Sequence, residues 1–163
     1  MAPQPKTNAR IFADLKQDHD RQRKLLAQVA SAAGDDRPAL FEELRIELQA
    51  HAAAEEEALY ATMLARPDLR EDARHSVSEH KEVDDLLGEL VQMDIESDEW
   101  AELFEKLRER YTHHIDEEEE DMFPAASQGL DPETEARIAA VFEKRKPREA
   151  ARAETELPGD ARE

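Results

Sequence analysis

Residues 51–60 read HAAAEEEALY and residues 114–123 read HIDEEEEDMF, so each segment begins with a histidine that is followed four positions later by a glutamate. Residues i and i+4 lie on the same face of an α-helix, and each pair therefore directs one nitrogen and one oxygen towards a common point. Because imidazole and carboxylate together suit iron, zinc or manganese, the segments predict two helices that carry metal ligands. The predicted ligands are His51, Glu55, His114 and Glu118.

A lone histidine precedes each of these pairs, so the whole pattern occurs twice. His19 stands before the first pair and His80 before the second, at nearly the same separation in both halves. The leucine pair at 25–26 also recurs at 86–87, as expected of an internal two-fold repeat. Such a repeat on facing helices would produce a site for two metal ions.

Apolar residues recur at helical spacing along most of the chain, and turn residues divide them into four long segments. No alternating strand pattern interrupts them. Four long helices joined by short turns form an antiparallel up-down-up-down bundle, so the predicted fold class is all-α. The predicted helices run from Thr7 to Ala33, from a cap at Asp35 or Asp36 to an interruption at Pro67, from about Leu69 to Met93, and from a cap at Ser97 or Asp98 to the vicinity of Pro124.

A start signal at residues 131–133 (Asp-Pro-Glu) predicts a short fifth helix beyond the bundle. After Pro147 the chain is rich in Ala, Glu, Arg and Pro, and Leu157 is its only large apolar residue. Such a composition buries too little apolar surface to become ordered, so residues 147–163 are expected to form a disordered tail. Residues 1–146 would then form one domain, which contains the bundle and the short helix.

Counting from the turns places the four histidines at one height in the bundle. His19 and His51 are equally far from the turn near Gly34, roughly 22 Å along the helix axes at about 1.5 Å per residue. His80 and His114 are at similar distances from the turn between the third and fourth helices. A lone histidine on an apolar helix face is usually a core residue, but four in one layer and in repeated register predict a metal centre.

The composition limits the functions that the chain can have. Its 163 residues include 41 acidic and 22 basic side chains, and the resulting net charge of −19 disfavours nucleic-acid binding. There are no cysteines, so disulfides, thiolate metal sites and iron–sulfur clusters are excluded. Because residues 1–10 lack the apolar core of a signal peptide and no apolar run reaches membrane-spanning length, a cytoplasmic protein without membrane contact is expected.

The repeated pattern resembles the hemerythrin-like (HHE cation-binding) domains, which carry H…HxxxE…H…HxxxE on four antiparallel helices. The resemblance covers about residues 10–127 and includes the extensions to Tyr60 and to Phe123. It implies a non-haem di-iron centre with a bridging oxo or hydroxo group, although zinc or manganese would also suit the ligands. By this resemblance the nitrogen ligands would be His19, His51, His80 and His114, and the carboxylates bridging the two irons would be Glu55 and Glu118.

One position departs from the oxygen-carrying hemerythrins. Those proteins have a second histidine on the third helix, one turn away from the first, whereas this chain has Ser76 one turn before His80. One iron would therefore lack a histidine and have a position that is open, water-filled or occupied by a carboxylate. The residues expected to approach it, as ligands or as hydrogen-bond partners of the ligands, are Glu56, Asp84 and Tyr111.

The resemblance and the missing histidine favour a protein that binds or senses a small oxidant such as oxygen, peroxide or nitric oxide. Three other functions stay open. The centre could catalyse peroxide removal or nitric-oxide reduction, with Tyr60 or Tyr111 donating a proton or an electron. The chain could instead store iron, or a metal-free bundle could serve as an interaction module. The fifth helix and the tail could dock a protein partner, whose identity the sequence does not indicate.

The residues fit no other common metal motif. Ferritin-like di-iron bundles need a glutamate three residues before a histidine on two helices, and no histidine here has one. The zinc-protease motif His-Glu-x-x-His is absent as well. The two remaining histidines are left out of the predicted centre, since His75 is expected at the surface and His113 could form its own pair with Glu117.

Overall fold

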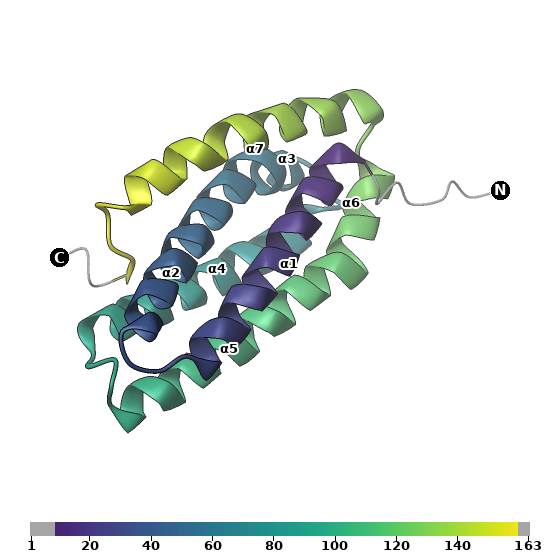
Figure 1. Ribbon diagram of the computed structural model, residues 1–163. Helices are drawn as coiled ribbons and strands as arrows, with labels where there is room; N and C mark the ends of the chain where they lie inside the picture. Colours follow the sequence, from purple (N-terminus) through teal and green to yellow (C-terminus); the bar gives the residue numbers. More distant parts are fainter. Residues whose placement is uncertain (1–8, 160–163) are drawn as a thin grey trace.

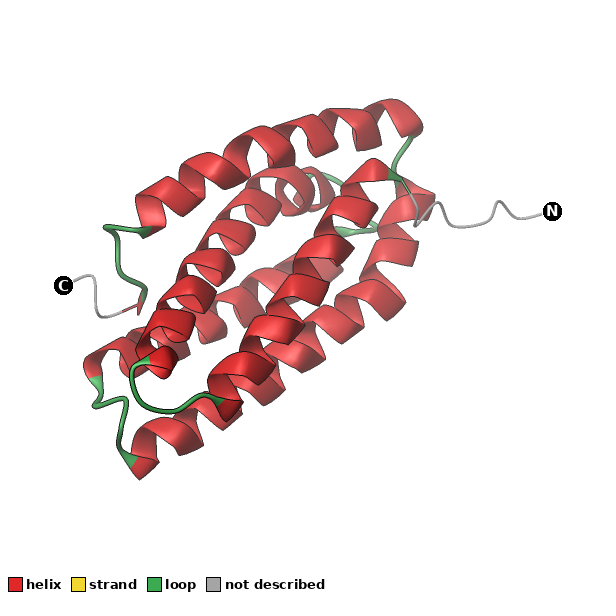
Figure 2. Ribbon diagram, viewed as in Figure 1, coloured by secondary structure: helices red, strands yellow, loops and turns green. Residues whose placement is uncertain are grey.

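A computed structural model describes residues 9–159, whose helices form an antiparallel bundle (Figure 1). A further helix, α7 (Pro132–Ala153), lies along α2 and α1. The described residues contain no strand (Figure 2), and the predicted all-α four-helix bundle with an additional C-terminal helix is confirmed. The bundle segments are α1 (Arg10–Ser31); α2 (Asp36–Glu55) continuing through η1 (Glu56–Tyr60) and α3 (Ala61–Leu64); α4 (Arg70–Gln92); and α5 (Asp98–Glu117) continuing through η2 (Glu118–Met122) and α6 (Phe123–Gly129).

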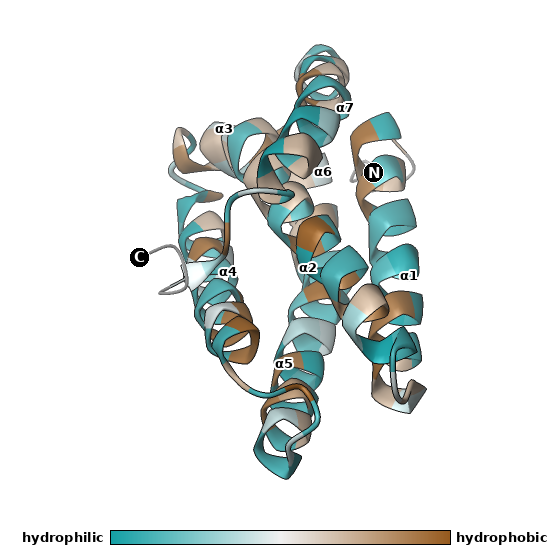
Figure 3. Ribbon diagram, turned by 60° about the vertical axis from the view of Figure 1, so that its left-hand side comes forward, coloured by the Kyte–Doolittle hydropathy of each residue, from teal (hydrophilic) through white to brown (hydrophobic). Residues whose placement is uncertain are grey.

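Local sequence signals account for several helix ends. The side chain of Ser97 accepts a hydrogen bond from the backbone N–H of Trp100 and caps α5, and Asp131 caps α7 in the same way. Gly34 has φ 58°, in the left-handed region that favours glycine, and so lets the chain turn between α1 and α2. Hydrophobic and hydrophilic residues alternate along the helices (Figure 3), as amphipathic helices require, but none of the helices within residues 9–159 is long and apolar enough to cross a membrane.

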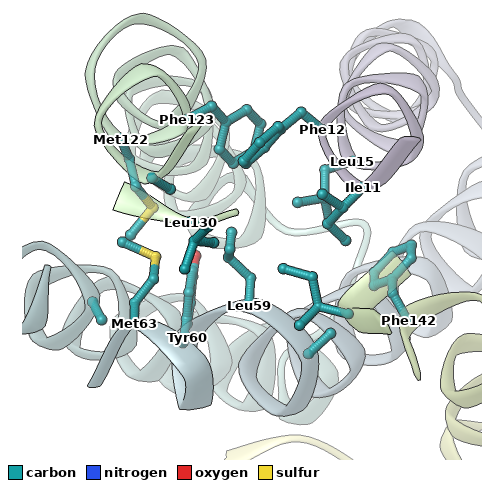
Figure 4. Packing of buried hydrophobic residues seen from close by; sticks show 14 of the residues in the cluster. Ile11, Phe12, Leu15, Leu59, Tyr60, Met63, Met122, Phe123, Leu130 and Phe142 are labelled. Carbon is teal, nitrogen blue, oxygen red and sulfur yellow. The ribbon is translucent and has the colours of Figure 1, made fainter. Parts of the chain in front are cut away.

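A polar layer divides the hydrophobic core into two clusters. One cluster includes Phe12 and Phe123, whose ring centroids are 5.2 Å apart (Figure 4), and the other surrounds Trp100. The four predicted histidine ligands stand between these clusters along the chain and are almost fully buried. Because close-packed apolar side chains on both sides fix the helices, the layer between them is held in place before any ligand binds. The exposed fractions are 0% for His19, 1% for His51, 5% for His80 and 1% for His114.

The prediction of a short fifth helix followed by a disordered tail is wrong for the described part of that segment, because α7 continues through Pro147 to Ala153. Proline removes a backbone hydrogen bond from a helix interior, so the helix needs support from elsewhere. Lys146 supplies it with an ion pair to Glu47 on α2, and Ala153 is buried. The contacts between α7 and α2 thus outweigh the local tendency of Pro147 to end a helix. The predicted helix start at Thr7 and residues 160–163 of the predicted tail lie outside the described residues.

The segment that follows α7 is also fixed by specific contacts. The backbone carbonyl of Glu156 accepts a hydrogen bond from Gln49 Nε2 at 3.0 Å, and the backbone N–H of Gly159 donates to Asp84 Oδ2 at 3.0 Å. Gly159 has φ 52°, and a Cβ atom at this position would lie 2.8 Å from the backbone oxygen of Asp84. Glycine therefore lets the segment approach α4 closely.

A pair of carboxyl groups, Asp14 on α1 and Glu143 on α7, makes the packing of α7 sensitive to pH. Burial and a hydrogen bond to Glu143 raise the pKa of Asp14 to about 7. The folded protein then keeps a proton that the unfolded chain releases near pH 4, so stability falls as the pH rises from about 4 to about 7. The pKa of Glu143 moves down, which offsets part of this loss.

We expect Asp14→Asn to raise the melting temperature at pH 8 by roughly 2 °C, a modest gain because partial exposure screens the repulsion. The decline in stability between about pH 4 and pH 7 should also become flatter, since the titrating group is gone. Thermal unfolding at a series of pH values measures both effects. Asp20→Asn, an exposed change on the same helix, is the control, and equal behaviour of the two variants would contradict the assignment.

Candidate metal centre

Two groups of buried side chains that share Glu55 form the polar layer. Within each group, one potential ligand atom per residue lies within 4.8 Å of the others. The first group is Glu55, His80, His114 and Glu118, and the second is His19, His51 and Glu55. The structure therefore brings together all six residues that the sequence singled out.

The two carboxylates lie between histidines of different hairpins. Glu55 Oε1 is 3.4 Å from His51 Nε2 and 3.3 Å from His80 Nε2. In the same way, Glu118 Oε1 is 2.8 Å from His114 Nε2 and 3.7 Å from His19 Nε2. In this arrangement each carboxylate could contact metal ions held by the neighbouring imidazole nitrogens.

Several buried atoms of the layer have no hydrogen-bond partner, which provides a test of whether a metal fits. His114 Nε2 and Glu118 Oε1 approach each other to 2.8 Å, but not in hydrogen-bonding geometry. Each unsatisfied buried polar atom costs about 1–3 kcal/mol, and a cation between them would satisfy several at once. The donor set therefore fits a metal centre. Within residues 9–159, the atoms of the layer without a hydrogen-bond partner are His19 Nε2, His51 Nε2, His114 Nε2, Glu55 Oε2 and Glu118 Oε1, together with His80 Nδ1 on the outer side of its ring.

Each of the four histidines directs its other ring nitrogen towards a carboxylate outside the layer. Such partners fix the orientation of the ring and make the inward nitrogen a better ligand. All four Nε2 atoms consequently face the same interior. The distances from Nδ1 are 2.7 Å for His19 to Glu119, 2.9 Å for His51 to Asp18, 2.8 Å for His114 to Glu79, and a looser 3.6 Å for His80 to Glu56.

These supporting carboxylates follow a rule in the sequence. The acid directly before each lone histidine supports the other histidine of its own hairpin, as Asp18 and Glu79 do. The acid directly after each central glutamate supports the lone histidine of the other hairpin, as Glu56 and Glu119 do. Glu56, one of the residues expected near the centre, is thus a neighbour of His80. The roles of Asp18, Glu79 and Glu119 were missed, although an acid directly before each lone histidine and directly after each central glutamate was the available signal.

A π-helical turn begins directly after Glu55 and another begins at Glu118. On a regular α-helix, residue i+5 lies about 140° around the axis, whereas a π-turn returns it to the face of residue i. Tyr60 is the residue that benefits, since its hydroxyl oxygen lies 2.9 Å from Glu55 Oε1 and 2.8 Å from Glu118 Oε2. It also lies 3.3 Å from His80 Nε2. The π-turn therefore places a phenol in the centre.

The half of the layer that contains His80 and the half that contains His19 differ at the residue five positions after the central glutamate. Phe123, directly after the second π-turn, corresponds to Tyr60, and its ring stacks on His19 with centroids 5.8 Å apart and planes 14° apart. The half that contains His80 therefore has a nearby hydroxyl oxygen, whereas the half that contains His19 faces a hydrocarbon ring. This difference is the main departure from the internal two-fold repeat.

The other residues expected near the centre have different partners. Asp84 accepts the hydrogen bond from Gly159, and the hydroxyl of Tyr111 donates to Gln22 Oε1. Ser76, which stands where oxygen carriers have a histidine, is buried and its hydroxyl lies 3.6 Å from Met122 Sδ. Tyr60 is thus the residue that reaches the position next to His80.

The charges of the layer favour a cation. Burial lowers the pKa of His51, but Glu55 and Asp18 outweigh this effect and raise it to about 10. The pKa of His114 is likewise raised to about 10 by Glu118 and Glu79 against the effect of burial. Although burial opposes it, the adjacent His51 and His80 hold the pKa of Glu55 well below its usual value. Glu55 therefore stays charged, and protons and metal ions compete for the space between it and the histidines.

Fold and site together define a cation-binding helical bundle. The hemerythrin HHE cation-binding domain matches residues 10–126, and the chain belongs to this family. Its structure is similar to the crystal structure of a hemerythrin HHE cation-binding domain-containing protein from Mycobacterium kansasii, an Rv2633c homologue, with a TM-score of 0.72 and 26% sequence identity. That similarity covers 86% of this chain and 90% of the other. No curated protein matches the chain.

Proposed function

We propose that this protein holds two non-haem iron ions in the buried layer and binds a small oxidant such as oxygen, peroxide or nitric oxide at one of them. His80 and His114 would hold one ion, His19 and His51 the other, and the two glutamates would lie between the ions. Iron in such a site supplies an exchangeable coordination position and one-electron redox chemistry. The observation that carries the proposal is the unequal surroundings of the two halves of the layer.

Tyr60 makes the half that contains His80 the more complete one. Its hydroxyl oxygen is close enough to the ligand atoms to act as a further oxygen donor, in place of the histidine that Ser76 replaces. The position expected to be open next to His80 is then filled by a phenol. The His19 half has only the Phe123 ring at the corresponding place, so we assign the exchangeable position to that half.

The protein around the layer limits what can reach it. Apolar clusters above and below exclude bulk water. A cavity of about 360 Å³ between α2, α4, the end of α7 and the segment after it is lined by Glu56 and His80, so it approaches the layer from the half that Tyr60 completes and not from the His19 half. Small molecules are therefore the ligands that this centre accommodates.

Metal analysis combined with absorption spectroscopy tests the proposal. Protein loaded with iron and then desalted should contain two irons per chain, and its spectrum should change when nitric oxide is added. A chain that retains zinc but no iron, or whose iron spectrum does not respond to nitric oxide, would contradict it. More than two retained irons per chain would favour storage instead.

Tyr60→Phe provides a separate test of the phenol. We expect the variant to retain both irons and to lose a visible phenolate-to-iron absorption band, because the ring remains while the oxygen is removed. Tyr111→Phe is the matched control, since it removes another buried phenol whose hydroxyl bonds to Gln22. Identical spectra for wild type and Tyr60→Phe would show that the hydroxyl is not a ligand.

An enzymatic role is the second candidate, and the buried hydroxyl of Tyr60 between two carboxylates favours it as a source of a proton. Steady-state consumption of peroxide by the iron-loaded protein distinguishes turnover from binding alone. Slower consumption by Tyr60→Phe than by Tyr111→Phe would support a catalytic Tyr60, whereas no consumption by wild type would leave the binding role.

A further inference from the structure

Two more His-x-x-x-Glu pairs face each other on the outside of the bundle. His75 and Glu79 lie on α4, and His113 and Glu117 lie on α5. Glu117 connects the two helices, since its Oε1 is 3.4 Å from His75 Nε2 and its Oε2 is 3.1 Å from His113 Nε2. Ligand atoms of His75, Glu79 and Glu117 all lie within 4.8 Å of one another. Two imidazoles and two carboxylates thus converge on one small region of the surface.

This surface cluster stands at the mouth of a narrow cleft that leads to the buried layer. The cleft has a volume of about 40 Å³ and is lined by His75, Glu79 and Glu117 of the cluster together with His114 and Glu118. Those two residues are 1% and 2% exposed, and His114 Nε2 and Glu118 Oε1 have no hydrogen-bond partner. Unsatisfied metal-binding atoms therefore lie at the inner end of the cleft.

Glu79 belongs to both the surface cluster and the surroundings of the buried layer. Its Oε1 accepts a hydrogen bond from His114 Nδ1 at 2.8 Å and lies 3.5 Å from His75 Nε2. The contact with buried His114 fixes Glu79, so one carboxylate of the cluster is held in place by the protein interior. This distinguishes the cluster from acidic side chains that are free to move on the surface.

We propose that His75, His113, Glu79 and Glu117 form a peripheral site for a divalent transition metal ion such as Zn²⁺ or Fe²⁺. Two imidazoles and two carboxylates are a donor set that suits these ions. The side chains of His75 and His113 are 57% and 72% exposed, so an ion can exchange with solvent here. The site lies where a metal ion would first be captured on the way to His114. It does not depend on which metal the buried layer holds.

Calorimetric titration of the full chain with Zn²⁺ tests this site. The protein is first loaded with iron and desalted, and its iron content is measured before and after the titration. We expect wild type to bind one additional Zn²⁺ per chain. The double variant His75→Gln/His113→Gln and the single variant Glu117→Gln should bind that ion at least tenfold more weakly while their iron content stays unchanged.

Glu102→Gln is the matched control for Glu117→Gln, because it removes an exposed carboxylate from the same helix without touching the cluster. It should bind the additional Zn²⁺ as wild type does. The proposal is overturned if wild type binds no additional ion, if Glu102→Gln loses as much affinity as Glu117→Gln, or if the histidine variants lose the buried iron as well. Should the buried layer fail to load with iron, the same titration of metal-free protein still applies, because wild type should bind one Zn²⁺ more than the double variant.

Discussion

Replacing Glu55 by glutamine should remove both metal ions from the buried layer, whereas replacing His19 by glutamine should remove only one. Glu55 belongs to both groups of potential ligands, and His19 belongs to one. The carboxylate of Glu55 is fully buried. Its Oε1 lies 3.4 Å from His51 Nε2 and 3.3 Å from His80 Nε2, and these histidines belong to different groups. Neutralising it removes charge from both halves at once, and we expect metal affinity to fall by at least about 100-fold, which corresponds to about 2.7 kcal/mol.

Metal content per chain and the rise in melting temperature on adding metal are the two measurements. A ligand that binds only the folded state at about 100 times its dissociation constant stabilises by about 2.7 kcal/mol, so the temperature rise should be lost in Glu55→Gln and reduced in His19→Gln. Glu57→Gln, an exposed change two residues away, is the control. Circular dichroism of the metal-free variants checks that they fold. If Glu55→Gln kept two ions, or if His19→Gln lost both, the shared-carboxylate arrangement would be wrong.

Metal binding should release protons and should strengthen as the pH rises. In the metal-free protein, carboxylates raise the pKa values of His51 and His114 to about 10. Both rings therefore carry an additional proton at pH 7, and the ion must displace these protons. Titration calorimetry in buffers of different ionisation enthalpy measures the release. An affinity for zinc that does not change between pH 6 and pH 8 would be the contrary result.

The six central residues could be placed from sequence because all the distances involved run along regular α-helix. A fixed rise per residue puts His19 and His51 at one height, and the i, i+4 rule puts Glu55 on the face of His51. Whether these residues bind metal stays a prediction. Tyr60 could not be placed by the same reasoning, because it lies five positions after Glu55 and regular geometry turns it away. Only the π-turn returns it to the site.

The C-terminal region shows a second limit of reading the sequence locally. Its composition and Pro147 indicated disorder, and both signals depend only on neighbours in the chain. The contacts that order it come from α2 and α4, for example from Gln49 and Asp84. These two contacts are hydrogen bonds, so hydrophobic periodicity did not reveal them. The surface cluster of His75 and His113 was missed for the same reason, since it requires two helices to be side by side.

Lys146 is the residue through which α7, outside the family-matched residues 10–126, should affect the buried layer. Its ammonium nitrogen lies 2.6 Å from Asp18 Oδ2 and 2.9 Å from Glu47 Oε1. Asp18 in turn accepts a hydrogen bond from His51 Nδ1. Lys146→Met leaves Asp18 and Glu47 close together without the lysine, while the half-exposed Arg21 remains 3.3 Å from Glu47 Oε1, so the change should cost up to about 3 kcal/mol of stability. It should also weaken metal binding, because Asp18 then no longer orients His51 as firmly.

Unfolding in urea and zinc affinity measure the two effects of Lys146→Met, and Lys144→Met, an exposed change on the same helix, is the control. The loss of stability should shrink as the pH falls below 3.8 towards the lowered pKa of Asp18, because that carboxylate then becomes neutral and no longer needs the lysine. Adding Glu47→Gln to Lys146→Met should recover part of the stability, because it removes the repulsion between two neighbouring carboxylates. If Lys146→Met behaved like Lys144→Met in both measurements, Lys146 would only help to hold α7 on the bundle and would not support the metal centre through Asp18.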